Sequence, residues 1–170
     1  MTPTKSLIGI FIIMILVLYI QSYLKPKYEY TIIQTFLDKI TGDTLLDKYP
    51  ILIYDRLQDP RSLLHSLFAY TYLFDTYSTI TPITPFRAKS KYTLIFNDNN
   101  DIAVHLISPK FQVDPKQPLD KQNSNVQYIT ISLKKRQVLI LPMHWHLASA
   151  SPFKAIMLDD ILTATIKSFT

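Results

Sequence analysis

An uncharged apolar run over residues 7–24 is the most pronounced pattern along the chain, and Lys25 and Lys27 close it. A helix of this length rises about 27 Å, close to the roughly 30 Å hydrocarbon core of a bilayer. The run therefore predicts an N-terminal single-pass transmembrane helix. Residues 1–27 would form a membrane anchor, with the lipid bilayer as its partner and a membrane as the location of the protein.

A signal peptide or a buried helix of a soluble protein accounts less well for this run. A cleaved signal peptide has a shorter apolar region and a small-residue cleavage site, whereas here Gln21, Ser22 and Tyr23 lead into Leu24. A buried helix packed in a soluble protein is expected to show a polar face at helical spacing. No such face occurs before Gln21.

Residues 28–170 carry the pattern of one mainly antiparallel β domain with flanking helices. Continuous apolar runs predict buried strands, and alternating runs predict half-buried ones. The predicted strands are residues 51–53, 92–96, 101–107, 126–133, 138–141 and 153–158. Because a polar turn separates the second from the third of these, we expect those two strands to pair as a hairpin. The fold class expected for the whole chain is α+β.

Short helical stretches are expected over residues 35–40 and 44–48, separated by Gly42, and two further helices are expected in this domain. Asp59 and Pro60 make a good helix start, and leucines at helical spacing then predict a helix over residues 60–74. Asp159 or Asp160 is expected to cap a C-terminal helix. Its predicted buried face consists of Ile161, Leu162, Thr165 and Ile166.

Composition excludes several kinds of chemistry. The chain has two glycines and no cysteine, so it has no glycine-rich phosphate loop, thiolate zinc site or cysteine nucleophile. The net charge is +5, and the densest basic run is residues 134–136. That run favours a solvated turn, although lipid headgroups or nucleic acid are the alternative partners. No nucleic acid and no small-molecule substrate are expected.

The histidines offer the one candidate for a metal site. On a strand, His144 and His146 would share a face, and His105 or an aspartate of residues 98–101 would be a third ligand. The alternative is a pair of hydrogen-bonded or solvated histidines at the rim of a barrel. Trp145 between them would then offer a surface for contacts. Two histidines are a weak signal, so no metal, no cofactor and no catalytic residue are expected.

Two stretches resemble the cupin-like JmjC domains, namely KYPILIYDRL at residues 48–57 and RQVLILPMHWHL at residues 136–147. The resemblance implies a small jelly-roll-type β domain over residues 28–170. Enzymes of that family are iron- and 2-oxoglutarate-dependent oxygenases with a two-histidine, one-carboxylate site. Here Leu147 falls on one ligand position, and His105 has no carboxylate two residues later. The resemblance therefore implies a cupin-like domain that has lost its iron site.

The chain is also similar to uncharacterised membrane-anchored proteins of large DNA viruses. Together these observations predict a membrane-anchored, non-catalytic structural or interaction protein of a virus particle, located in the virion or in an internal membrane of the host. Its protein partners are unknown. The alternative is a divergent membrane-bound, metal-dependent oxygenase that uses His144 or His146.

Overall fold

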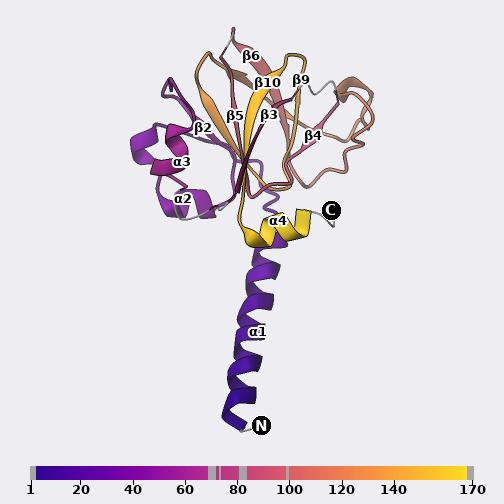
Figure 1. The fold of residues 1–170 in the computed structure, drawn as a ribbon. Coiled ribbons are helices and arrows are strands. Elements are labelled where there is room, and N and C mark those ends of the chain that lie inside the picture. Colours follow the sequence, from indigo (N-terminus) through magenta and orange to yellow (C-terminus); the bar gives the residue numbers. More distant parts are fainter. Residues whose placement is uncertain (1–2, 69–71, 73, 81–83, 99, 168–170) are drawn as a thin grey trace.

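The structure is a computed structural model, and it describes residues 3–68, 72, 74–80, 84–98 and 100–167. It contains helices, short 3₁₀ turns and two β-sheets (Figure 1). The helical elements are α1 (Pro3–Leu24), η1 (Leu37–Lys39), α2 (Gly42–Leu46), α3 (Ser62–Ser66), η2 (Leu119–Lys121) and α4 (Ile161–Lys167). The strands are β1 (Ile33–Thr35), β2 (Ile51–Ile53), β3 (Phe74–Ile80), β4 (Phe86–Arg87), β5 (Tyr92–Phe96), β6 (Ile102–Ile107), β7 (Ile129–Leu133), β8 (Val138–Pro142), β9 (His146–Ser149) and β10 (Phe153–Asp159).

The strands form a sandwich of two sheets. One sheet has the order β1-β2-β8-β5-β10-β3, and the other has the order β4-β9-β6-β7. All pairs are antiparallel except β1 with β2, so the larger sheet is mixed. From β3 onward the chain changes sheet at every connection except the one between β6 and β7. This winding of eight strands through two facing sheets is compatible with a jelly roll.

The larger sheet is buried on both faces, which explains its continuous apolar strands. One core cluster lies between the two sheets, and a second packs the outer face of the larger sheet against α2 and α3. Every residue of β2, β5 and β8 is buried. By contrast, β7 borders solvent on one face and alternates as predicted. The predicted positions of these four strands are confirmed, except that β7 begins at Ile129 and not at residue 126.

The predicted hairpin of residues 92–96 and 101–107 is wrong. In the structure β5 pairs with β8 and β10, whereas β6 pairs with β7 and β9. The polar turn between them carries the chain from one sheet to the other. Both strands are central in their sheets, so each already has two neighbours.

The helix predicted over residues 60–74 is much shorter in the structure. Its helical part, α3, ends at Ser66, and Phe74 begins the edge strand β3; residues 69–71 and 73 lie outside the described residues. The C-terminal helix is confirmed, and Asp160 caps it by accepting the Thr163 N–H at 2.8 Å. Its predicted buried face is wrong, however, because Thr163 is buried and Ile161 is 65% exposed.

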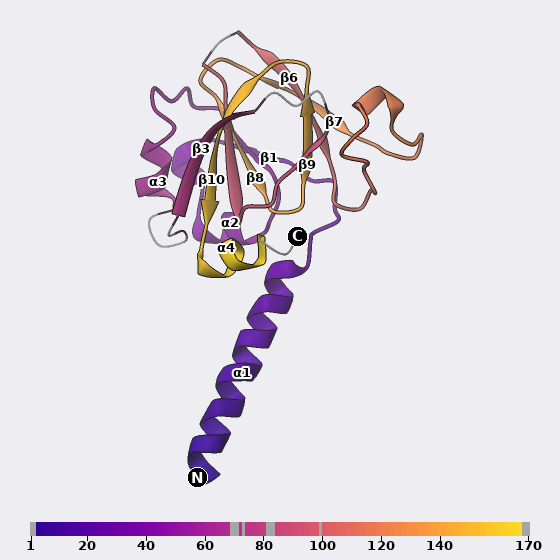
Figure 2. The same ribbon diagram turned by 45° about the vertical axis from the view of Figure 1, so that its right-hand side comes forward.

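The N-terminal helix α1 projects away from the sandwich as a rod (Figures 1 and 2). Within the part of the chain that the structure describes, no helix combines the length and the hydrophobicity that a membrane crossing requires. The predicted transmembrane anchor is therefore wrong, and with it the single-pass membrane location and the membrane part of the fold class.

Candidate functional site

The candidate site that holds both His144 and His146 is a cavity of about 380 Å³ at one edge of the smaller sheet. It lies between β4, the turn from β8 to β9, and the irregular segment that follows β6. Its lining residues are Pro26, Arg87, Pro109, Phe111, Gln112, Val113, His144 and His146. The two histidines singled out in the sequence thus share one cavity, together with an arginine that the sequence did not single out.

Pairing of β4 with β9 brings Arg87 to this cavity. Arg87 is directly opposite His146 in the antiparallel register. Opposite residues on paired strands project their side chains from the same face. Two further backbone hydrogen bonds extend the pairing, from the Ala88 N–H to the Trp145 carbonyl and from the His144 N–H to the Ala88 carbonyl, each 2.8 Å.

His144 occupies a turn and not the strand. Its φ of 77° places it in the left-handed region, which histidine tolerates better than most residues. The predicted strand geometry therefore does not hold for His144, because β9 begins only at His146. The turn directs the His144 ring toward Arg87, and the guanidinium Nη2 lies 3.1 Å from its Nδ1. A guanidinium can only donate, so His144 Nδ1 accepts and the proton of the neutral ring lies on Nε2.

His146 is half-buried and is kept neutral. Burial lowers its pKa to about 4, with further lowering by the positive charge of Arg87 and by His144. Its Nδ1 atom is buried and has no hydrogen-bond partner among the described residues. His146 therefore presents an uncharged imidazole at ordinary pH.

These residues do not fit the iron site that the resemblance implies. Arg87 places a permanent positive charge against both histidines, which repels a metal cation. Among the described residues, no group of three or more His, Cys, Asp or Glu side chains is placed to hold a metal. The proposed third ligand, His105, forms a hydrogen bond of 2.9 Å between its Nδ1 atom and the Thr130 hydroxyl, and its ring lies edge-on to the Tyr128 ring.

Trp145 points away from the surface. Its side chain is 1% exposed, belongs to the core between the sheets, and meets the Tyr30 ring edge-on at a centroid distance of 6.0 Å. The side chain suggested as a contact at the rim is therefore not accessible to a partner. Arg87 is the functional candidate that the sequence analysis missed. No local signal marks Arg87, because its partner His144 is 57 residues away along the chain.

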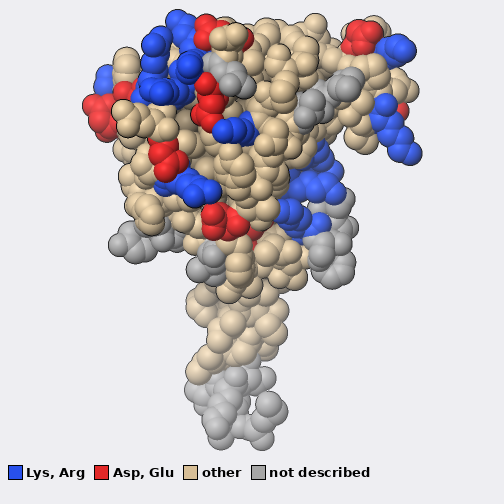
Figure 3. Space-filling model, turned by 45° about the horizontal axis from the view of Figure 1, so that its top comes forward, with Lys and Arg blue, Asp and Glu red and all other residues tan. Residues whose placement is uncertain are grey.

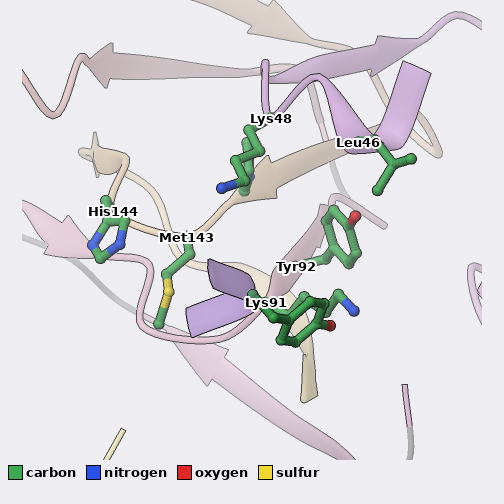
Figure 4. A pocket seen from close by; sticks show the side chains of 8 residues that line it. Leu46, Lys48, Lys91, Tyr92, Met143 and His144 are labelled. Carbon is green, nitrogen blue, oxygen red and sulfur yellow. The ribbon is translucent and has the colours of Figure 1, made fainter. Parts of the chain in front are cut away.

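A second cavity, of about 350 Å³, lies where α1 meets the sandwich (Figure 4). Tyr19 of α1 lines it together with Leu46, Tyr92 and Met143, so it is largely apolar. Burial raises the pKa of Tyr92 to about 12, with smaller effects of Tyr19 and Asp160.

Both lysines of this second cavity have protein partners. Lys91 pairs with Asp160 at 2.9 Å, and Lys48 donates to the Lys25 carbonyl at 3.3 Å. This cavity therefore offers a ligand less unpaired charge than the cavity at Arg87.

The basic run of residues 134–136 forms the turn between β7 and β8, as the turn interpretation predicted. Its side chains are exposed, and the Lys135 N–H donates to Asp101 at 3.1 Å. In Figure 3, the Lys and Arg side chains at the upper left are mixed with acidic ones, whereas those on the right beside α1 have no acidic side chain among them.

The comparison with protein-family models gave no match, and neither did the comparison with curated proteins.

Proposed function

We propose that this protein is a non-catalytic structural protein that associates with other protein chains through α1. The observation that carries the proposal is the exposure of α1. Its large apolar side chains from Leu7 to Tyr19 are between 43% and 69% exposed. Exposed apolar surface of this extent marks an interaction site.

The partner proposed is another copy of the chain. From Leu7 to Gln21 the helix has no charged residue, so identical helices can pack without charge repulsion. A helix with one apolar stripe can bury that stripe against one neighbouring helix, whereas a helix that is apolar all round exposes apolar surface unless it is covered on every side. We therefore expect assemblies of more than two chains.

The energy available is sufficient for association. Burying one Leu, Ile or Phe side chain contributes about 1.5–3 kcal/mol, and association costs about 4–15 kcal/mol of lost translational and rotational freedom. Full burial of a few of the α1 side chains offsets that cost.

Sedimentation equilibrium of the full chain in detergent-free buffer tests the proposal. The double variant Ile12→Glu, Leu16→Glu places charges on one face of α1, since residues four apart are neighbours on a helix. We expect the unaltered chain to form assemblies and the double variant to shift towards monomer. Ile161→Glu is the matched control, because Ile161 is similarly exposed but lies on α4.

Three results would overturn this function. The first is an unaltered chain that sediments as a monomer, and the second is a double variant that assembles as well as the unaltered chain. The third is a monomer that floats with phosphatidylcholine vesicles, which would mean that lipid and not protein covers α1.

The non-catalytic part of the proposal has a separate measurement. We expect elemental mass spectrometry of the full, untagged chain to find iron and zinc well below one atom per chain. The reason is the Arg87 guanidinium beside His144 and His146. One iron or zinc per chain, lost in His146→Ala, would instead favour the metal-dependent oxygenase.

We further propose that the sandwich is a cupin-like domain and that the protein belongs to a particle of a large DNA virus. The two resembling stretches and a strand order compatible with a jelly roll support the first of these. The second rests on the resemblance alone. Detection of the chain in purified virus particles by mass spectrometry would test it.

A further inference from the structure

We propose that the cavity at Arg87 binds a small organic anion through a phosphate or carboxylate group, with Arg87 as its anchor. This site is independent of α1 and goes beyond the structural role proposed above. The cavity has about 380 Å³, within the range of cavities that bind small molecules.

The charge of Arg87 is available to a ligand. The ion pairs of the described residues involve Lys27, Lys91, Lys154 and Lys167, each with an aspartate, and none involves Arg87. The Arg87 side chain is exposed, and its guanidinium contacts the neutral His144 ring. A guanidinium has five N–H donors in a planar fork, so donors remain after one of them bonds Nδ1.

No acid competes for this charge inside the cavity. None of the described residues that line it is an Asp or Glu. Asp114, next along the chain after the lining residue Val113, accepts the Lys116 N–H at 2.9 Å within its own exposed turn. An anion therefore meets a positive field at the cavity without repulsion from a lining carboxylate.

The histidines add neutral donors to the cationic one. His144 carries its proton on Nε2 because Nδ1 accepts from Arg87. The Nδ1 atom of His146, which has no hydrogen-bond partner among the described residues, is buried at the same cavity. A polar ligand atom there would supply the hydrogen bond that this ring nitrogen lacks. A phosphate or carboxylate group offers several acceptor oxygens, which suits this set of donors.

The remaining walls select an organic ligand over a bare ion. Phe111, Val113, Pro109 and Pro26 give the cavity an apolar side in addition to the Arg87 and histidine side chains. A flat apolar body attached to the acid group would bury against them. We therefore expect an aromatic or aliphatic acid to bind more tightly than inorganic phosphate.

The single tryptophan provides the readout. Trp145 lies between His144 and His146 in sequence and is 1% exposed, so its fluorescence reports on the adjacent turn. The full chain is titrated at constant ionic strength with phenyl phosphate, benzoate and inorganic phosphate, and calorimetry provides an independent affinity. Constant salt is needed because Arg87 is exposed and screening changes its field.

Two variants make the test specific. Arg87→Gln is expected to weaken binding at least tenfold, the loss that follows from removing a charged hydrogen bond. Lys89→Gln is the matched control, since Lys89 is exposed two residues away and does not line this cavity, although it lines a neighbouring cavity together with Arg87. It is expected to change the affinity less than twofold. Equal melting temperatures would show that neither variant alters the fold.

Saturable binding of phenyl phosphate or of benzoate, lost in Arg87→Gln, supports the proposal, and the stronger ligand identifies the acid group. The proposal is overturned if neither ligand binds at millimolar concentration. It is also overturned if both variants weaken binding equally, since that would indicate a general attraction to basic surface. Binding of Zn²⁺ or Co²⁺ that strengthens in Arg87→Gln would overturn it as well, because a cation would then be the natural occupant.

Discussion

At the scale of the single residue, the environment of His146 is unusual for a histidine near a surface. Burial, Arg87 and His144 all disfavour its protonated form, and together they lower its pKa to about 4. In the unfolded chain the same ring has a pKa near 6.5. Between these two values the native state binds fewer protons than the unfolded state.

We therefore predict that the free energy of unfolding rises with pH between about 4 and 6.5. The contribution of His146 is fully present above pH 6.5 and is lost as the pH falls to 4, by at most about 3 kcal/mol. The measurement is urea unfolding at a series of pH values. His146→Gln should flatten this dependence, and His65→Gln, which alters an exposed ring on α3, should leave it unchanged. Equal pH dependence in all three proteins would contradict the prediction.

At the scale of the element, Asp160 holds α4 against the sandwich with both carboxylate oxygens. Oδ1 accepts from the Thr163 N–H at 2.8 Å and from its hydroxyl at 2.7 Å, and Oδ2 pairs with Lys91 at 2.9 Å. Burial alone would raise the pKa of Asp160, but the bonds from Lys91 and Thr163 outweigh it and hold that pKa below its usual value. The cap and the ion pair thus act through one side chain.

Two substitutions separate these roles. Asp160→Ala removes both and should lower the free energy of unfolding by about 1–2 kcal/mol, the range measured for lost N-caps. Asp160→Asn keeps a capping oxygen and should cost less. Denaturant unfolding measures both, and Asp120→Ala, on an exposed 3₁₀ turn, should change the value by less than about 0.5 kcal/mol. An equal loss in the two Asp160 variants would mean that the cap contributes little.

At the scale of the whole molecule, the two sheets depend on the core between them. Leu106 of β6 is 0% exposed and lies opposite Leu147 of β9 in the register. Both belong to the cluster that joins the sheets. Truncation of either side chain would therefore leave a void in the layer between the two sheets.

Leu106→Ala should lower the free energy of unfolding by about 2–5 kcal/mol, the usual cost of such a cavity. Leu46→Ala is the control, because Leu46 is 71% exposed and should change stability little. Thermal and denaturant unfolding measure both. A small loss for Leu106→Ala would mean that the sheets can close over the missing side chain.

The sequence by itself determined where most elements lie. Continuous apolar runs placed β2, β5 and β8, alternation placed β7, and the pair Asp159 and Asp160 marked the start of α4. Each of these signals is local, since burial on one or both faces is recorded in neighbouring residues. The apolar run of residues 7–24 likewise placed α1, but no helix among the described residues has the length and hydrophobicity that a membrane crossing requires.

Only the tertiary structure decided which strands pair and which side chains meet. The local sequence of β5 does not specify that its neighbours are β8 and β10 and not β6. The reason is that the hydrophobic pattern of a strand reflects its burial and not the identity of the strand it pairs with. For the same reason, the sequence pattern did not identify Arg87 as a residue of the candidate site. The meeting of Arg87 with His144 and His146 depends on the pairing of β4 with β9, strands far apart along the chain.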